Sequence, residues 1–265
     1  MATKLDEIFE YKKKELPETK KALPLELLLK KIEENPRKPL DVLSALRGKP
    51  GTTNIIAEIK RKTPFKGVLK EIDPIELAQI YELNGAAAIS ILTESHYFNG
   101  SLKFLSEVRS QVNIPLLRKD FIFDEYQVYE AVACGADFFL LIATYLSEND
   151  LNNLLKIGQK MGLPALVEVH DEDDLKKALT VNAQIIGVNN RNLKNGQTDL
   201  NISRNLLKNK YGGGQIIVSE SGIKERDQIE ELESLGAHTF LVGESLMLAN
   251  DIPAKLRELR GIENG

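Results

Sequence analysis

Short apolar segments alternate with helical patterns from Asn54 onward, and this alternation constrains the fold more than any other feature of the sequence. Eight of these segments have the composition of buried strands. They are Ile55–Ile59, Ala87–Leu92, Pro115–Leu117, Phe138–Ile142, Ala165–Val169, Ile185–Val188, Ile216–Val218 and Thr239–Val242. Several stretches between them carry apolar residues at spacings of three and four, as amphipathic helices do. The clearest are Pro74–Leu83, Glu125–Cys134, Glu148–Lys160, Asp173–Leu179, Asn201–Leu207 and Lys224–Leu235.

Strands that alternate with helices are joined by right-handed crossovers and lie parallel in one sheet. Eight such units in a chain of 265 residues predict an α/β fold, a single closed (β/α)8 TIM barrel. An open doubly wound sheet is the main alternative. It is disfavoured because no G-x-G-x-x-G motif follows the first strand or any other.

The first 50 residues contain helical patterns and no strand. One amphipathic helix is expected around residues 5–16 and a second around residues 25–32, after Pro24, which suits a first helical turn. A third, short helix is expected over Asp41–Arg47, with Asp41 as its N-cap. We therefore expect residues 1–50 to form a helical extension packed on the barrel, and residues 51–265 to form the catalytic barrel domain.

Composition excludes several classes of function. The net charge of −4, from 35 basic and 39 acidic residues mixed along the chain, argues against a nucleic-acid partner. No apolar run approaches the ~18 residues of a membrane span, and the N-terminus lacks the apolar core of a signal peptide. A cytoplasmic location without membrane partners is therefore the default expectation. A monomer is the working assumption, because no feature of the sequence decides the oligomeric state. One cysteine and three scattered histidines offer no zinc-binding spacing, so no metal site is expected.

The first barrel segment ends in charged residues, Glu58 and Lys60. Because side chains alternate along a strand, these two point to the same side and Ile59 points to the other. In a closed barrel both charges would enter the interior. An exposed edge strand carrying a surface ion pair is the alternative interpretation.

Polar residues recur at the carboxyl ends of the eight predicted strands, and seven of these ends carry a charged group. The working face of a barrel is built from these ends and the loops that follow them. The residues are Glu58, Lys60, Thr93, Glu94, Arg118, Lys119, Asp120, Thr144, Glu168, Asn189, Arg191, Ser219, Glu220, Ser221, Gly222, Gly243 and Glu244. Burying an unpaired charge is costly, so these groups need one another or a charged ligand, and they predict a polar active site.

The last two strand ends point to a phosphate. Ser221 and Gly222 follow the seventh strand, and Gly243 and Glu244 follow the eighth, so backbone N–H groups in glycine-containing turns are available. Residues 244–249 could form the short helix whose N-terminus receives a phosphate in such barrels. The Glu244 side chain is then expected to face outward. Two ordinary turns without a ligand are the alternative.

Six stretches carry a resemblance to a known family. They are residues 56–64, 117–122, 166–170, 187–193, 219–223 and 242–247. In order and spacing they resemble indole-3-glycerol-phosphate synthase, over nearly the whole chain. The resemblance implies a barrel with an N-terminal helical extension and a carboxy-lyase of tryptophan biosynthesis. It implies conversion of 1-(2-carboxyphenylamino)-1-deoxyribulose 5-phosphate to indole-3-glycerol phosphate, carbon dioxide and water, without a metal or an organic cofactor.

Ring closure requires an acid and a base in one site. The resemblance implies Lys119 as the general acid, and burial should lower its pKa towards neutrality while nearby carboxylates oppose that change. Glu168 is the candidate base. Lys60, held by Glu58, could steer the substrate anions or act as the acid for dehydration, and the sequence does not assign the two lysines to the two acid steps. Asn189 is expected to bind the reacting hydroxyl region.

Further substrate contacts are expected from Arg191, a clamp for an anionic end of the substrate, and from Ser221, which we place in both the catalytic and the binding set. The sequence departs from the family pattern at Thr63 and Phe65, where serines are usual. Thr63 keeps a hydroxyl for the substrate, whereas Phe65 loses a hydrogen bond and changes how the loop closes. Glu220 is expected at the rim of the barrel, in a structural role.

Smaller expectations concern three aromatic residues of the loops. His170 is expected to make a hydrogen bond at a helix start or within a loop, and Tyr97 and Phe98 to cover the aromatic ring of the substrate.

Three other functions compete with this interpretation. A Schiff-base aldolase would also use a barrel lysine, but through a covalent imine. Phosphoribosylanthranilate isomerase would place a cysteine at a strand end, and the single Cys134 lies on a predicted helix instead. A catalytically inactive sugar-phosphate-binding barrel would bind the substrate without turnover.

Overall fold

The computed structural model describes residues 3–47, 51–192, 195–208, 214–237 and 239–262. Eight parallel strands close a barrel in the order β1-β10-β9-β8-β7-β6-β5-β4, which confirms the predicted fold. The strands are β1 (Asn54–Ile59), β4 (Ala88–Leu92), β5 (Leu116–Lys119), β6 (Phe138–Ile142), β7 (Ala165–Val169), β8 (Ile185–Asn189), β9 (Ile216–Glu220) and β10 (Thr239–Val242). Each predicted segment overlaps one of them.

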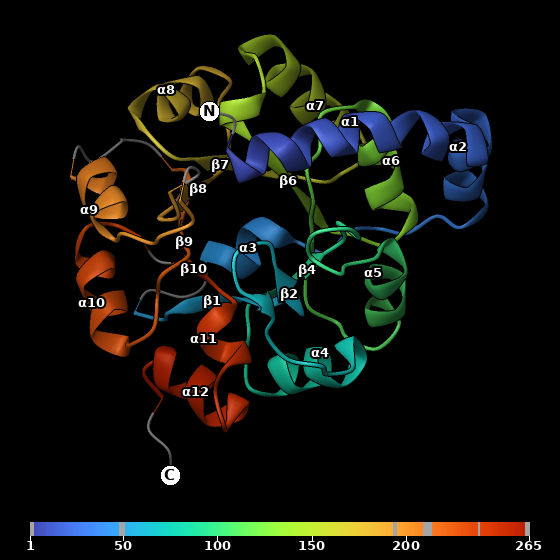
Figure 1. The fold of residues 1–265 in the computed structure, drawn as a ribbon. Coiled ribbons are helices and arrows are strands. Elements are labelled where there is room, and N and C mark those ends of the chain that lie inside the picture. Colours follow the sequence, from blue (N-terminus) through green and yellow to red (C-terminus); the bar gives the residue numbers. More distant parts are fainter. Residues whose placement is uncertain (1–2, 48–50, 193–194, 209–213, 238, 263–265) are drawn as a thin grey trace.

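Helices surround the strands on all sides (Figure 1). They are α4 (Pro74–Leu83), α5 (Leu102–Arg109), α6 (Glu125–Ala133), α7 (Glu148–Lys160), α8 (Glu172–Thr180), α9 (Asn201–Leu207), α10 (Arg226–Ser234), α11 (Glu244–Met247) and α12 (Ile252–Leu259), with a 3-10 turn at Ala143–Tyr145. The sequence analysis did not predict α5 or α12. It also missed a small hairpin of β2 (Lys62–Thr63) and β3 (Gly67–Val68) in the loop after β1.

Two hydrophobic layers follow from the alternation of side chains along the strands. On β1, Ile55 and Ala57 face outward into the layer between strands and helices, and Ile56 faces inward. The inward layer fills the barrel with residues such as Leu117 and Phe138, so the barrel is packed and does not form a pore. Glu58, Lys119 and Glu220 therefore lie above this layer, at the carboxyl ends of the strands.

Three helices precede the barrel: α1 (Lys4–Ala22), α2 (Leu25–Glu34) and α3 (Val42–Arg47). Helix α3 covers the amino end of the barrel, where the Leu46 carbonyl accepts hydrogen bonds from Asn54 Nδ2 at 2.9 Å and Thr239 Oγ1 at 2.8 Å. The predicted N-cap is confirmed, because Asp41 Oδ1 accepts from the backbone N–H of Ser44 at 3.0 Å. The domain boundary expected at residue 50 lies outside the described residues.

Helix α1 lies across the opposite, carboxyl end and runs over the strands in Figure 1. Its Phe9 ring stacks on Tyr145, which follows β6, with 4.7 Å between ring centroids. Its Lys12 Nζ lies 3.5 Å from Asp120 Oδ1, just after β5. The extension thus reaches the face where the polar strand ends gather. Among the described residues, no helix combines the length and the apolar composition that a bilayer span requires.

Candidate active site

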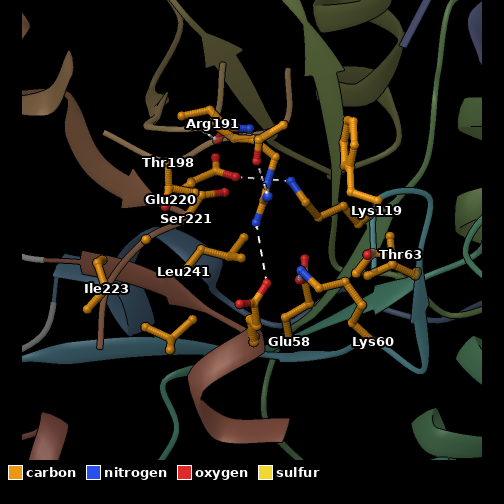
Figure 2. Close-up of a pocket in the computed structure, with 18 of the residues that line it drawn as sticks. Glu58, Lys60, Thr63, Lys119, Arg191, Thr198, Glu220, Ser221, Ile223 and Leu241 are labelled. Carbon is orange, nitrogen blue, oxygen red and sulfur yellow. Dashed lines mark hydrogen bonds and ion pairs between the residues drawn. The ribbon is translucent and has the colours of Figure 1, made fainter. Parts of the chain in front are cut away.

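A cavity of about 1020 Å³ opens at the carboxyl ends of the strands. Strand ends from around the barrel contribute to its wall, and Leu5 of α1 reaches it from the extension. Figure 2 shows Glu58, Lys60, Lys119 and Glu220 with their side chains gathered in this space. The charged groups predicted from separate strand ends therefore share one pocket.

Lys119 is the centre of the charged cluster. Its Nζ lies 3.1 Å from Glu168 Oε2 and 3.0 Å from Glu220 Oε2, and both contacts are ion pairs. The three side chains come from β5, β7 and β9. Alternate strands of such a barrel contribute side chains to the same layer, which explains why residues far apart in sequence meet here.

One cation shared by two buried carboxylates leaves the cluster short of positive charge. Burial lowers the pKa of Lys119, but Glu220 and Glu168 more than compensate, so its pKa lies above the ordinary value. Burial raises the pKa of Glu168, but Lys119 and His170 more than compensate and the net change is downward. For Glu220, burial and the neighbouring Glu168 outweigh Lys119 and raise the pKa to about 7. The expected fall in the Lys119 pKa is therefore wrong, because the two carboxylates outweigh the effect of burial.

Two glycines make room for the carboxylates. A Cβ on Gly187 of β8 would lie 2.0 Å from Glu220 Oε1, and a Cβ on Gly243 would lie 2.5 Å from Glu58 Oε1. Contacts under about 3 Å require atoms to move, so any larger residue would displace the acid group. The site thus depends on glycine at these two positions for its shape.

Glu58 and Lys60 form a second ion pair, Glu58 Oε1 with Lys60 Nζ. The Glu58 side chain is 2% exposed and that of Lys60 14%, and both line the cavity. The prediction that they point to the same side is confirmed, and the alternative of an exposed edge strand is wrong, because β1 pairs with β4 and β10.

The wall beyond β8, β9 and β10 carries cations and open turns. Ser221 and Gly222 both have left-handed backbones, with φ of +66° and +82°. For a residue other than glycine this conformation costs about 1–3 kcal/mol, and it concentrates at functional sites. Arg191 Nη2 lies 3.7 Å from Glu244 Oε2, and Lys66 Nζ pairs with the same carboxylate. The expectation that Glu244 faces outward is therefore wrong. Its carboxylate lines the cavity because two cations attract it.

A sequence model described as indole-3-glycerol phosphate synthase matches residues 5–259. The indole-3-glycerol phosphate synthase of Campylobacter jejuni subsp. doylei is 47% identical to the chain over 96% of this chain and 99% of that protein. The chain belongs to the indole-3-glycerol phosphate synthase family. Family members from Sulfurimonas denitrificans and Aliarcobacter butzleri are 46% and 44% identical, with at least 97% of this chain covered.

Solved structures similar to this member of the indole-3-glycerol phosphate synthase family include two 3-hexulose-6-phosphate synthases. One has a TM-score of 0.63 at 18% identity and covers 79% of this chain and 100% of its own. The other, from Salmonella typhimurium, has a TM-score of 0.64 at 12% identity and covers 78% of this chain and 97% of its own. At such identities the likeness supports the barrel fold alone.

All the site residues predicted for this indole-3-glycerol phosphate synthase family member line the one cavity. They are Glu58, Lys60, Thr63, Lys119, Glu168, Asn189, Arg191, Ser221, Gly222, Gly243 and Glu244. Thr63 Oγ1 accepts a hydrogen bond from the backbone N–H of Lys66 at 2.9 Å, so its hydroxyl shapes the loop after β1. The Phe65 ring lies against Gly196, where a Cβ would come within 2.7 Å of it. Among the described residues, no group of His, Cys, Asp and Glu side chains is arranged to hold a metal.

Glu220 is the main residue of the cavity that the sequence analysis misplaced. It is 1% exposed and contacts Lys119, so its expected place at the rim is wrong. The reason is that β9 continues to Glu220, two residues past the predicted end at Val218. Alternation from the inward-facing Val218 would have placed Glu220 inside the barrel.

Other residues near the strand ends differ in whether they reach the cavity. Arg118 faces away from the cavity and pairs with Glu130 of α6 at 3.1 Å. Phe98 lines the cavity, whereas the Tyr97 hydroxyl donates a hydrogen bond to Glu7 of α1 at 2.9 Å. His170 packs between Glu168 and the first turn of α8. The expected hydrogen bond at a helix start is confirmed, because the His170 backbone N–H donates to Asp174 Oδ2 at 3.3 Å, whereas the contact with Glu168 was not predicted.

Proposed function

We propose that the chain converts 1-(2-carboxyphenylamino)-1-deoxyribulose 5-phosphate to indole-3-glycerol phosphate, carbon dioxide and water. The observation that carries this proposal is the position of Lys119 between Glu168 and Glu220, in a cavity whose far wall offers cations and glycine turns to a phosphate. Membership of the family supports the choice of substrate.

Lys119 acts first, as the acid for ring closure. Its raised pKa means that it carries a proton at neutral pH, so it can donate that proton to the substrate ketone oxygen while an aromatic carbon attacks. Glu168 supplies negative charge beside the ring cation that develops. The bond to the carboxylate then breaks, carbon dioxide leaves, and its electron pair returns to the ring.

Dehydration completes the indole. A hydroxyl leaves as water after protonation, and a proton leaves the carbon skeleton, for which Glu168 is the proposed base. Lys60 and Lys119 both remain available as the acid, since each lies in the cavity with a carboxylate partner. Glu58 holds Lys60, and Asn189 binds the reacting hydroxyl region.

The phosphate is proposed to bind the backbone N–H groups around Ser221, Gly222 and Gly243, with Arg191 nearby. Cations at that wall now pair with the Glu244 carboxylate, so the phosphate has to compete with an internal anion for them. Phe98 is proposed to cover the aromatic ring. We also propose that residues 1–50 complete the cavity of the catalytic unit 51–265, because Leu5 lines it. The chain is further proposed to be a cytoplasmic monomer.

The test is the appearance of indole-3-glycerol phosphate fluorescence when the purified chain meets the substrate in buffer that contains a metal chelator. A signal that requires Lys119 would support the proposal. Substrate binding without turnover would instead identify an inactive sugar-phosphate-binding barrel. If the substrate does not bind at all, the proposed reaction is wrong. If activity is seen only in buffer without the chelator, the proposal that the reaction needs no metal is wrong.

A further inference from the structure

His170 lies two residues beyond Glu168, at the carboxyl end of β7, and its side chain is 9% exposed. Its Nε2 lies 3.3 Å from Glu168 Oε1, and it has no partner in hydrogen-bond geometry among the described residues. Glu168 Oε2, the other oxygen of that carboxylate, faces Lys119. Glu168 is thus held between a lysine on one side and an imidazole on the other.

The opposite side of the imidazole is anchored. His170 Nδ1 lies 3.2 Å from Thr144 Oγ1, and the same hydroxyl donates a hydrogen bond to Asp174 Oδ2. An ionised carboxylate can only accept hydrogen bonds, so the Thr144 proton points to Asp174 and the Thr144 oxygen is free to accept. The Nδ1 atom of His170 must therefore carry a hydrogen.

This assignment decides the state of the other nitrogen. A neutral imidazole with hydrogen on Nδ1 has a bare lone pair on Nε2, and that lone pair would face a carboxylate oxygen. Two acceptors cannot stabilise each other, and both are buried here, where an unsatisfied polar atom is costly. One proton between Nε2 of His170 and Oε1 of Glu168 removes the conflict.

We propose that His170, anchored by Thr144 and Asp174, is a positioning residue that keeps one proton on its Nε2 against Glu168. The imidazolium then keeps Glu168 anionic and oriented when Lys119 moves its hydrogen bond to the substrate. The proton on Nε2 is held whatever reaction the chain catalyses, whereas its effect on catalysis rests on the proposed function.

The surrounding charges agree with this arrangement. The groups that face His170 and its anchor are Glu168 on β7, Asp174 and Lys177 on α8, and Glu220 on β9. Burial lowers the pKa of His170, but the nearby carboxylates of Asp174 and Glu168 more than compensate, so its pKa is raised. His170 should thus keep its charge at pH values where an ordinary histidine has lost it.

Nitrogen NMR of the full-length chain tests the proton directly. Only three histidines contribute, and the variants His170→Gln and His96→Gln assign the signals. We expect both ring nitrogens of His170 to be protonated at pH 7, with a titration midpoint above the usual ~6.5. Asp174→Asn should lower that midpoint without touching Glu168. A His170 ring that is neutral at pH 7 would overturn the proposal, whether or not the chain has the proposed activity.

Kinetics test the positioning role. His170→Gln keeps an N–H donor but loses the charge, so the pKa of Glu168 should rise and the acid limb of the kcat profile should move to higher pH. A movement of one pH unit corresponds to about a tenfold loss of rate below the limb. KM should change little, and His96→Gln, an exposed control, should leave the profile in place. An unchanged profile in His170→Gln would refute the role even if the NMR shows the proton.

Discussion

The barrel buries carboxylates at both ends, and Asp137 at the amino end and Glu220 at the carboxyl end differ in how their oxygens are hydrogen-bonded. Asp137, just before β6 at the amino end, accepts hydrogen bonds from Arg37 at 2.7 Å and Arg109 at 2.8 Å. It also accepts from the backbone N–H groups of Leu40 at 2.8 Å and Leu116 at 2.9 Å. Every hydrogen-bonding site of this buried anion has a donor, and the donors come from the extension and from the barrel.

Glu220, at the carboxyl end, is as deeply buried, but within the described part of the chain it has one donor, Lys119, which it shares with Glu168. Its Oε1 has no partner among the described residues. A buried acceptor without a donor destabilises the fold, and a like charge next to it adds to the cost. The comparison indicates that the amino end is built for stability, whereas the carboxyl end gives up stability to keep reactive groups available.

The largest effect should come from the shared cation. Lys119→Met removes the proposed acid, and a positioned acid contributes typically 10²–10⁴-fold, or about 2.7–5.4 kcal/mol of barrier. We expect kcat of the fluorescence assay to fall by that factor, while Lys103→Met on the exposed face of α5 keeps full activity. Near-normal turnover in Lys119→Met would show that Lys119, at the carboxyl end of the barrel, is not the acid.

Asp137→Ala should damage stability and spare the chemistry. It leaves the Arg37 and Arg109 guanidinium groups without their shared anion, and breaking a buried pair in this way costs about 3–5 kcal/mol. Urea unfolding monitored by circular dichroism should show this loss, with kcat of the folded protein unchanged. The exposed Asp173→Ala is the matched control. If Asp137→Ala lowers kcat and leaves the free energy of unfolding unchanged, the amino end does not serve stability alone.

Glu220→Gln should show the opposite pattern, with a pH dependence. The folded-state pKa of Glu220, about 7, lies above its ordinary value of 4.5, so the folded protein binds this proton more tightly than the unfolded chain. Stability from this group is present below about 4.5 and is lost as pH rises to about 7. The variant should therefore gain stability relative to the wild type between pH 5 and pH 8 while losing activity. Unfolding free energies at both pH values measure this, with exposed Glu26→Gln as control. If the unfolding free energies of Glu220→Gln and the wild type differed by the same amount at pH 5 and pH 8, the raised pKa of Glu220 would be contradicted.

The smallest effect is expected at Phe65, in the loop over the carboxyl end. Its side chain is 38% exposed, and it lies against Gly196. Exposed substitutions usually change free energies by no more than about 0.5 kcal/mol, so Phe65→Ser should alter KM by roughly two- to threefold and leave the free energy of unfolding unchanged. Steady-state kinetics would check this. A tenfold change in KM would show that the contact of this ring with Gly196 controls substrate access.

Much of this could be predicted from the sequence because a barrel repeats one local pattern. Each buried strand is a short apolar run, and each strand end continues into polar residues, so the residues predicted to act on or bind the substrate lie in one cavity, whereas Arg118 faces away from it. The errors at the site arose at segment ends. The last two residues of β9, Ser219 and Glu220, and the short hairpin at Lys62–Val68 contain no apolar run, so periodicity does not detect them.

Residue types and their order along the chain determined the fold class, the working end of the barrel and the list of charged groups. The tertiary structure alone decided how those charges are shared. Lys119 faces two carboxylates, and Glu244 turns inward to Lys66. The imidazole of His170 contacts Glu168. The reason is physical: alternation along a strand tells which way a side chain points, whereas pairing depends on distances between strands that the sequence does not contain.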